Sequence, residues 1–531
     1  MFYRNTKTFM TFDKKMKLQS YGNHNYLNKW KIKMNLNINL IVAVDTNWGI
    51  SKNTSIPWHI KEDMNLFQDV TKRSYEPKKY NAVIMGKNTW KLLPVPFRGL
   101  RDRINIVIST TMSSDELNED NTTKSESYVV KSLEEALDLC NKLQPGKVFI
   151  GGGINIYKEA LQKFNINEIY LTQIKGNYDC DNIFPYELLN SLLPEYKIHS
   201  KKVFHCIDHN ITEKNRIETT FTKFYKGEIP IQFNNNTEEE NYLKMLEDVL
   251  STGHFRKTRN SNTWSKFGKT LEFDLSNGIP VLSTKKIFIR GIFEELLFFL
   301  KGDTNVKHLS DKNVNIWNAN TSREFLDSIG LNHYEPNTMG PMYGYNWRFY
   351  GEPYKGPDHN YSGGFDQIKY CLDLIKNDPF SRRILLTTFN PSIAKEGVLY
   401  PCHSLINQFY VEENNKLSMS CYNRSQDAFL GYPFNLTMSS LLVNMFCEVI
   451  NNDETYKGPK LIPGRLIMNL GDVHIYENHY EQCVRQILRD SFKFPKLIFS
   501  EKITNLTDFK FEDLQLVDYN CYPSIIAKMV A

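Results

Sequence analysis

Residues 147–161 read KVFIGGGINIYKEAL, and this stretch decides the fold of the first part of the chain. A short apolar run leads into three glycines, and the apolar residues that follow recur with a spacing near 3.6. This pattern predicts a buried strand, a tight turn and a helix. Strands that alternate with helices predict an α/β domain with a mostly parallel central sheet and flanking helices. Similar apolar runs flank the stretch on both sides: NLIVAV (39–44), NAVIMG (81–86), INIVIST (104–110) and EIYLTQI (168–174).

Four segments divide the chain by composition. Residues 1–36 form a basic extension, with eight Lys/Arg against one acid, and 37–225 form the α/β domain. Within that domain, 111–127 is polar and is expected to be a surface loop, and 203–226 is expected to close the domain as an antiparallel hairpin. A short polar junction at 226–237 precedes a second domain, 238–531, whose mixture of strands and long helices predicts an α+β fold.

Composition limits the functional classes. The net charge of +5 over 531 residues argues against nucleic acid or a membrane as the main partner. The nine cysteines include no CxxC pair, so neither a metal site nor a disulfide framework is expected. A reducing, cytoplasmic location fits best. Organellar targeting by residues 1–36 stays open, although the extension is rich in Lys rather than Arg.

Asp63 is the first candidate for chemistry. It stands three, four and seven residues before Leu66, Phe67 and Val70, on the apolar stripe of a helix expected from Glu62 onward. A carboxylate in that position has a raised pKa and can transfer a proton in a dry pocket. Complementing the helix N-terminus is an equally weighted alternative on spacing alone.

Two strand-to-helix turns suit phosphate groups. MGKNTW (85–90) and IGGGINIY (150–157) each follow a strand and open a helix, where backbone N–H groups point outward. Each is a weak signal alone. Together with a buried acid in one small α/β domain they indicate a nucleotide-dependent reductase.

In sequence order, IVAVDTNWGI, IPW, MGKNTW, GLRDRINIVIST, FIGGGINIYKEAL and IYLTQI resemble dihydrofolate reductase over about 37–225. The resemblance implies that Asp63, with Thr172, assists protonation of the pterin while NADPH delivers hydride. The folate-binding residues that it implies are Val42, Ala43, Asp63, Phe67, Arg103 and Thr172. The cofactor-binding residues that it implies are Ala43, Gly49, Ile50, Gly86, Lys87, Asn88, Thr89, Ser109, Thr110, Gly151, Gly152, Gly153 and Tyr157. Gly151 departs from the family, which usually has a branched apolar residue there. Either the pocket is looser or the glycines are shifted by one.

The second domain places ionisable groups in unusual settings. In GIFEELLFFLKG (291–302), Glu294 falls beside Lys301 on a polar edge, whereas Glu295 falls among aromatic residues, which is costly unless it is hydrogen-bonded or functional. SRRILLTTFN (381–390) is expected to be a strand with Arg382 and Arg383 at its mouth, on opposite sides.

Cys402, in YPCHSLINQFY (400–410), is more often a small core residue than a nucleophile on its own. Arginines near a thiol attract phosphate and stabilise the thiolate, which can add to an electron-poor double bond. Nearby polar segments, CYNRSQDAFLGYPFNL (421–436) and MNLGDVHIYENHY (468–480), suit an anion with amide edges and a hydroxyl-bearing ligand. Residues alone therefore indicate covalent chemistry on a phosphorylated polar ring.

LSTKK, EELLFFLKGDTN, IWNAN, GPMYGYNWR, DPFSRRILLTTFN, LYPCHSLINQFY, YNRSQDAFLGYPFN, GDVHIYENHY and YPSIIAKMVA, in this order, resemble thymidylate synthase over about 238–531. The resemblance implies that Cys402 attacks dUMP and that the C-terminal tail folds over the site. Proton transfer and closure around methylenetetrahydrofolate would fall to Glu295, Trp317, Tyr343 and His403. The dUMP-binding residues would be Arg259, Arg382, Arg383, Gln408, Arg424, Ser425, Asp427, Asn435, His474 and Tyr476, with Arg382 and Arg383 coming from a partner subunit.

One loop departs from that family. HFRKTRNSNTWSKFG (254–268) has Asn and Ser in place of glycines, and counting back from Phe267 puts Thr258 at the expected arginine position. Arg256 and Arg259 flank it, and Arg259 is taken as the phosphate ligand.

The whole chain is thus similar to the bifunctional dihydrofolate reductase–thymidylate synthases. This implies NADPH and 5,10-methylenetetrahydrofolate as cofactors, dUMP and dihydrofolate as substrates, no metal, and a homodimer through 238–531. An enzyme with one inactive half is the first alternative, and a nucleotide-responsive binding protein that uses the basic extension is the second.

Overall fold

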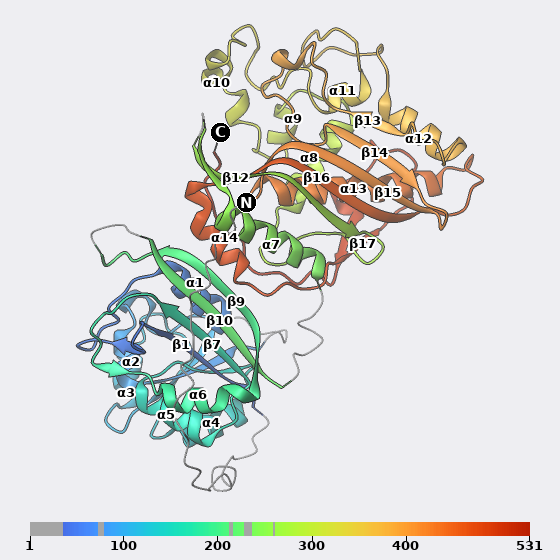
Figure 1. The fold of residues 1–531 in the computed structure, drawn as a ribbon. Coiled ribbons are helices and arrows are strands. Elements are labelled where there is room, and N and C mark those ends of the chain that lie inside the picture. The colour runs from blue at the N-terminus through green and yellow to red at the C-terminus, as the bar shows by residue number, and fades with distance from the viewer. Residues whose placement is uncertain (1–35, 73–78, 212–215, 228–235, 259–260, 531) are drawn as a thin grey trace, which may run out of the picture. The chain divides into compact units, whose positions relative to one another are not determined.

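The computed structural model describes residues 36–72, 79–211, 216–227, 236–258 and 261–530 (Figure 1). The basic extension, apart from Leu36, and most of the junction at 226–237 lie outside these residues. The chain separates into two compact units. The described residues of 1–40, 74–169 and 184–194 form one unit, and those of 41–73, 170–183 and 195–531 form the other.

An eight-stranded sheet has the strand order β5-β4-β3-β6-β1-β7-β10-β9. The pairs β1–β6, β6–β3, β3–β4 and β4–β5 are parallel, whereas β9 and β10 form an antiparallel hairpin. The predicted α/β fold with its terminal hairpin is therefore confirmed. The strands are β1 (Ile38–Val44), β3 (Asn81–Gly86), β4 (Arg103–Ile108), β5 (Ser127–Val130), β6 (Val148–Ile150), β7 (Glu168–Ile174), β9 (Tyr196–Ile207) and β10 (Arg216–Lys226), with a separate pair β2 (Gly49–Ser51) and β8 (Asn182–Ile183).

The helices before residue 195 include α4, which forms where apolar residues recur with helical spacing and a capping residue marks the first turn. In α4, Leu133, Ala136 and Cys140 are buried along one face, and the Ser132 side chain accepts a hydrogen bond from the Glu135 backbone N–H at the helix start. The helices are α1 (Lys61–Lys72), α2 (Lys87–Leu92), α3 (Ser114–Asp120), α4 (Leu133–Leu143), α5 (Ile154–Lys163) and α6 (Tyr186–Leu192).

The prediction of a loop over 111–127 is wrong in its middle, because α3 lies there. The Ser113 side chain accepts a hydrogen bond from the Glu116 backbone N–H and starts the helix. Leu117 is its only buried residue. With one buried residue, the sequence of α3 shows no recurring apolar spacing from which a helix could be predicted.

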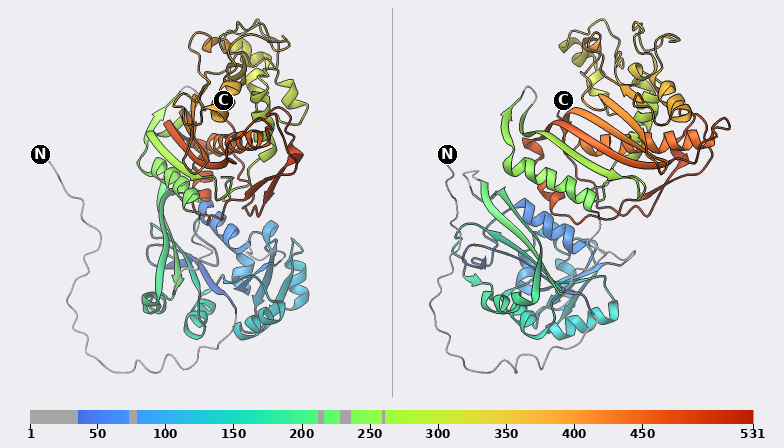
Figure 2. Two further views of the ribbon diagram at one scale, coloured as in Figure 1. Left: turned by 90° about the vertical axis from the view of Figure 1, so that its right-hand side faces the viewer. Right: turned by 45° about the vertical axis from the view of Figure 1, so that its right-hand side comes forward.

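A six-stranded sheet of order β11-β12-β16-β15-β14-β13 organises the chain after residue 237. The β15–β16 pair is parallel and the other pairs are antiparallel. The long helix α13 packs on this sheet, as the orange-red helix in Figure 2 shows. The mixture confirms the predicted α+β fold. The strands are β11 (His254–Lys257), β12 (Asn262–Asp274), β13 (Leu385–Thr387), β14 (Ile406–Val411), β15 (Lys416–Asp427) and β16 (Ile462–Tyr476), with a separate pair β17 (Lys496–Phe499) and β18 (Leu514–Val517).

Two apolar helices, α8 and α13, fill the core of this part. Ten of the twelve residues of α8 are buried. Among the described residues, α13 alone has the length and composition to cross a membrane, but 83% of its most apolar window is buried inside the protein. The helices are α7 (Thr237–Thr252), α8 (Ile289–Leu300), α9 (Lys307–Ser310), α10 (Arg323–Ser328), α11 (Gly344–Arg348), α12 (Gln367–Asn377), α13 (Gly431–Asn452) and α14 (Tyr480–Ile487).

The strand expected at 381–390 is much shorter than predicted. β13 spans only Leu385–Thr387, and Arg382 and Arg383 lie in the turn before it, both exposed. The argument that strand alternation sends them to opposite sides therefore does not apply.

Glu239, in the first turn of α7, ties this helix to the loop before α8. Its carboxylate accepts hydrogen bonds from the backbone N–H and the hydroxyl of both Ser283 and Thr284, at 2.6–3.0 Å. The residue is fully buried, and burial raises its pKa while these donors lower it. A buried carboxylate with four donor groups is stable only as a complete set.

Replacing Glu239 with Ala should leave these donors unsatisfied and lower the free energy of unfolding by about 3 kcal/mol or more. Denaturant unfolding followed by tryptophan fluorescence measures the change. Glu240→Ala, which removes one hydrogen bond from the Ser491 hydroxyl, is the matched control and should cost about 1 kcal/mol. Equal losses in both variants would contradict the role given to Glu239.

Candidate active sites

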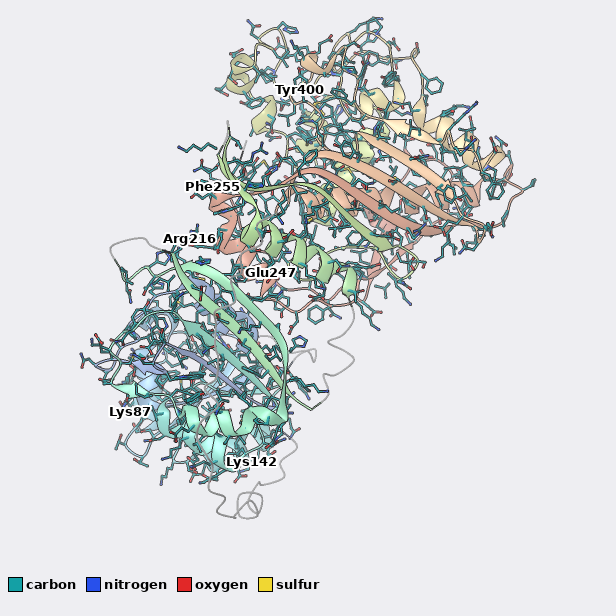
Figure 3. The ribbon with its side chains drawn as sticks, in the orientation of Figure 1. Lys87, Lys142, Arg216, Glu247, Phe255 and Tyr400 are labelled. Carbon is teal, nitrogen blue, oxygen red and sulfur yellow. The ribbon has the colours of Figure 1, made fainter. Side chains whose placement is uncertain are left out.

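Cys402 lies in the loop between β13 and β14, and a side chain from β15 fixes that loop. Arg424 donates from Nε to the carbonyl oxygen of Pro401 at 2.8 Å and from Nη2 to that of Tyr400 at 2.9 Å. Tyr400 is labelled in Figure 3. The backbone N–H of Ser425 points to the carbonyl oxygen of Cys402 at 3.4 Å. The nucleophile candidate is therefore held by the neighbouring strand.

The Tyr343 hydroxyl lies against Cys402 at two points. It accepts a hydrogen bond from the Cys402 backbone N–H at 3.2 Å and lies 3.5 Å from Sγ. Burial raises the pKa of the Cys402 thiol, while the hydrogen bond from Tyr343 and the charge of Arg424 lower it. These two groups oppose the effect of burial, which is the larger effect and leaves the pKa of the free thiol raised.

Glu295, on α8, is buried as predicted, and the indole Nε1–H of Trp317 donates to its Oε1 at 2.6 Å. Burial raises the pKa of Glu295 to about 7, and the Trp317 hydrogen bond opposes this. A carboxyl that titrates near neutrality suits proton transfer. The prediction for Glu294 is wrong, because it is buried and pairs with Lys312 at 2.6 Å instead of lying beside Lys301.

Three rings stack behind the thiol. Tyr343 stacks on Phe299 with centroids 4.9 Å apart and on His403 with centroids 4.5 Å apart. Burial lowers the pKa of His403 to about 4, so its imidazole is neutral at pH 7. A neutral ring can orient its neighbours without adding charge beside the thiol.

An amide network lies at the C-terminal end of β15. Gln426 Oε1 accepts hydrogen bonds from Asn423 Nδ2 at 2.8 Å and from Asn435 Nδ2 at 3.1 Å. Asn423 Oδ1 accepts from the backbone N–H of Ser404 at 2.7 Å. The sequence placed Asn423 and Gln426 in a polar segment that suits an anion with amide edges, but it identified neither as a ligand. The signal was present, since polar residues at these positions of a strand beside a buried helix need partners.

Asp427, His474 and Tyr476 lie on paired strands. Asp427 and His474 are register partners of β15 and β16, and the His474 and Tyr476 rings meet edge to face at 5.1 Å. β16, which carries both His474 and Tyr476, is fifteen residues long. Asp427 Oδ1 also accepts from the backbone N–H groups of Phe429 and Leu430, which orients it.

The stretch 254–268 was expected to supply one phosphate ligand, Arg259. Arg256, on β11, pairs with Asp472 at 3.2 Å, and Arg259 lies outside the described residues. Gln408 is exposed on β14, as are Arg382 and Arg383 before β13. Arg256, Gln408, Arg382 and Arg383 are thus exposed in the single chain.

The expected reductase residues of the second compact unit centre on α1. A hydrogen bond joins the half-buried Asp63 carboxyl to the buried Thr172, and burial raises the Asp63 pKa to about 6 while this bond lowers it. The neighbouring Glu62 is more deeply buried. In the same unit Val42 is buried, whereas Ala43, Ile50 and Phe67 are half-buried, and the Gly49 backbone N–H donates to Asp45.

The other compact unit holds the glycine turn. The Gly86 backbone N–H donates to the Gly152 carbonyl oxygen at 2.8 Å, and a Cβ at Gly153 would lie 3.6 Å from Thr89 Oγ1. The first turns of α2 and α5 therefore lie side by side, and the glycines between them leave the backbone uncovered by side chains. This arrangement fits a dinucleotide phosphate. Gly152 has φ +101°, and a Cβ there would lie 2.8 Å from the Tyr157 ring.

The remaining residues expected in this unit differ in their surroundings. Lys87 pairs with Glu116 at 3.1 Å, and the Ser109 hydroxyl accepts from the backbone N–H of Met112. Asn88 follows Lys87 in the first turn of α2, and Thr110 is exposed. Burial lowers the pKa of Arg103 to about 10.

Gly151 is different from the two glycines after it. A Cβ at Gly151 would meet Val83 Cγ1 at 3.4 Å and the Ile84 carbonyl oxygen at 3.6 Å, which is ordinary contact. The turn itself needs Gly152, and the Gly152–Gly153 peptide bond is cis. The backbone therefore requires glycine at Gly152, whereas Gly151 has room for a side chain.

An α/β reductase followed by an α+β enzyme with a half-buried thiol is the class of protein that these folds and side chains define. Comparison with known proteins agrees. A dihydrofolate reductase family model matches residues 37–226, and a thymidylate synthase family model matches residues 240–531. Among the described residues, no group of three His, Cys, Asp or Glu could hold a metal ion.

Curated relatives match nearly the whole chain. The bifunctional dihydrofolate reductase-thymidylate synthase of Zea mays is 35% identical over 93% of this chain and 96% of its own length. That of Leishmania major is 36% identical over 92% of this chain and 94% of its own length. The chain belongs to the bifunctional dihydrofolate reductase–thymidylate synthase family. It is an NADPH-dependent oxidoreductase and a methyltransferase that uses methylenetetrahydrofolate to convert dUMP to dTMP.

Replacing Tyr343 with Phe should slow alkylation of Cys402 by iodoacetamide at pH 8. The hydroxyl lowers the pKa of the thiol, so its loss raises that pKa and reduces the thiolate fraction. Peptide mass spectrometry over a pH series measures the change, and Tyr345→Phe is the control, since its hydroxyl bonds to the Glu352 carbonyl oxygen instead. An unchanged pH profile for Tyr343→Phe would contradict the role of the hydroxyl.

Proposed function

We propose that Cys402 is the nucleophile of the synthase reaction and forms a covalent adduct with dUMP. The observation that carries this is the Tyr343 hydroxyl at 3.5 Å from Sγ, beside a loop clamped by Arg424. Addition of the thiolate to C6 forms an S–C6 bond and moves the C5–C6 π electrons to C5, which takes the methylene carbon of the folate. Transfer of the methylene carbon breaks its bond to one folate nitrogen, and loss of the C5 proton then breaks its bond to the other. Hydride transfer from the released tetrahydrofolate completes the methyl group, expels Cys402 and leaves dihydrofolate.

The neighbouring residues take roles that their chemistry supports. Glu295, with its raised pKa, transfers protons with Tyr343 and His403, and Trp317 orients Glu295 by hydrogen bonding. Arginines hold the phosphate, and polar groups of β15, α13 and β16 hold the pyrimidine and ribose. The proposed dUMP-binding residues are Arg259, Arg382, Arg383, Gln408, Arg424, Ser425, Asp427, Asn435, His474 and Tyr476.

In the reductase reaction, Asp63 holds and transfers the proton, and Thr172 orients the Asp63 carboxyl by hydrogen bonding. The raised pKa of Asp63 supports this role, because a carboxyl that titrates near pH 6 can hold a proton near neutrality. When bound, NADPH supplies the hydride that turns dihydrofolate into tetrahydrofolate. Val42, Ala43, Phe67 and Arg103 are proposed to bind folate. The proposed NADPH-binding residues are Ala43, Gly49, Ile50, Gly86, Lys87, Asn88, Thr89, Ser109, Thr110, Gly151, Gly152, Gly153 and Tyr157.

The two reactions form a cycle in which the reductase consumes the dihydrofolate that the synthase releases. We place the reductase domain at 37–225 and the synthase domain at 238–531, joined by the junction 226–237. We propose a cytoplasmic location, in which the nine cysteines stay reduced. Their free thiols in the structure support this.

Incubation with 5-fluoro-dUMP and methylenetetrahydrofolate should give an adduct on Cys402, because fluorine at C5 cannot leave as a proton does. Intact mass and peptide mapping measure it. Cys402→Ser should abolish the adduct and dTMP synthesis but leave NADPH oxidation by dihydrofolate unchanged. Asp63→Asn should do the reverse and lower reductase turnover by about 10²-fold or more. A mapped adduct on another residue would contradict the assignment.

We further propose a homodimer through the six-stranded sheet. Ile406 and Tyr422 are register partners on β14 and β15, and both are exposed, whereas Asn407 and Phe409 on the other face are buried. A row of exposed apolar side chains on one sheet face supports a protein interface. The exposed apolar residues are Leu385, Ile406, Tyr410, Tyr422 and Ile462.

Tyr410→Glu should convert the dimer to monomers, because a carboxylate in the middle of an apolar interface loses its hydration without gaining a partner. Light scattering with size-exclusion chromatography measures the mass. Synthase activity should fall with the mass, since Arg382 and Arg383 act on the partner's substrate, and reductase activity should remain. Ile498→Glu, on the separate strand β17, is the control. A monomeric wild type would contradict the proposal.

A further inference from the structure

Helix α1, which carries Asp63, is joined to helix α14 within the same compact unit (Figure 1). The Asp69 carboxylate, six residues after Asp63, accepts hydrogen bonds from Arg485 at 2.7 and 2.9 Å and from Arg489 Nε at 2.9 Å. The Arg489 side chain is only 1% exposed. A buried guanidinium needs an anionic partner, and Asp69 is the carboxylate that supplies one.

The opposite edge of the same guanidinium holds the C-terminal segment, defined here as residues 521–530. Arg489 Nη1 donates to the Thr284 carbonyl oxygen at 2.6 Å and to the Pro523 carbonyl oxygen at 3.0 Å. Its Cζ lies 4.8 Å from the centre of the Tyr522 ring. The Tyr522 backbone N–H donates to the Ser283 carbonyl oxygen at 2.8 Å. Arg489 therefore anchors the start of the C-terminal segment on the loop before α8.

The far end of the C-terminal segment contacts the wall of the synthase site. The Lys528 carbonyl oxygen lies 2.8 Å from Nε2 of the fully buried His479. The His479 ring meets the Tyr476 and Phe429 rings, each with centroids 5.6 Å apart. Tyr476 is one of the residues assigned to dUMP above. The segment is thus held at one end by Arg489 and at the other beside the substrate.

We propose that Asp69 is a positioning residue for the synthase reaction. It fixes Arg489, which fixes the C-terminal segment that closes the synthase site, so the helix bearing the reductase acid Asp63 also sets how the synthase closes. This rests on the synthase function proposed above. The coupling is reciprocal, so substrates that order the C-terminal segment also strengthen the hold of Arg489 on α1.

The test is Asp69→Asn in the full-length enzyme, which keeps the shape of the side chain and removes its charge. The KM for methylenetetrahydrofolate should rise about 3- to 30-fold, because closure depends on the anchored segment. The Kd for dUMP alone should stay the same. Hydrogen exchange of residues 521–530 should become faster, and Asp69→Glu should restore both the KM and the protection.

Glu481→Gln is the matched control, since it removes the Lys61–Glu481 pair at 3.4 Å between the same two helices without reaching Arg489. It should leave the KM for methylenetetrahydrofolate unchanged. Equal effects in Asp69→Asn and Glu481→Gln would overturn the proposal, as would weaker dUMP binding that Asp69→Glu does not rescue. A wild-type enzyme without synthase activity would instead refute the proposed function itself, before any variant is compared.

Discussion

The proposed synthase site depends on one constraint: its ionisable groups are buried or half-buried, so fixed neighbours, more than water, set their protonation. Burial alone raises the pKa of Cys402 and of Glu295 and lowers that of His403. Arg424 then serves twice, because it clamps the loop of Cys402 and lowers the thiol pKa. The same seclusion that strengthens these electrostatic effects also requires every polar group around the site to have a partner.

The sequence predicted both fold classes well, because the spacing of apolar residues indicates which faces of strands and helices are buried. The strands and helices around the glycine turn and the core helix α8 were strongly patterned, and they form as expected. Errors occurred where burial is slight or the partner is distant in sequence. Helix α3 buries a single residue, and Glu294 pairs with Lys312, eighteen positions away, so no local pattern could indicate either. The strand expected over 381–390 is also shorter, because Arg382 and Arg383 lie in a turn before β13.

The sequence indicated which residue types belong to the candidate sites, but it did not indicate which side chains they contact. An acid among aromatic residues marked Glu295, but only the fold brings the Trp317 indole to it at 2.6 Å. On α1 the helical spacing identified a buried carboxylate, yet Glu62 is more deeply buried than Asp63. Burial raises the Glu62 pKa to about 7, and its hydrogen bond runs to Cys206. Spacing gives the face of a helix, whereas depth is set by what packs against it, which the sequence of one helix does not contain.

The departure at Gly151 bears on whether both halves are active. An L-residue with a side chain at Gly152 would be strained at φ +101° and would collide with the Tyr157 ring, so the backbone of the turn requires glycine there. The turn keeps its glycine, and Gly86 still bonds to it. Gly151 therefore changes the space beside Val83 without changing the backbone at the proposed cofactor site. The backbone of the turn thus gives no reason to expect an inactive reductase half.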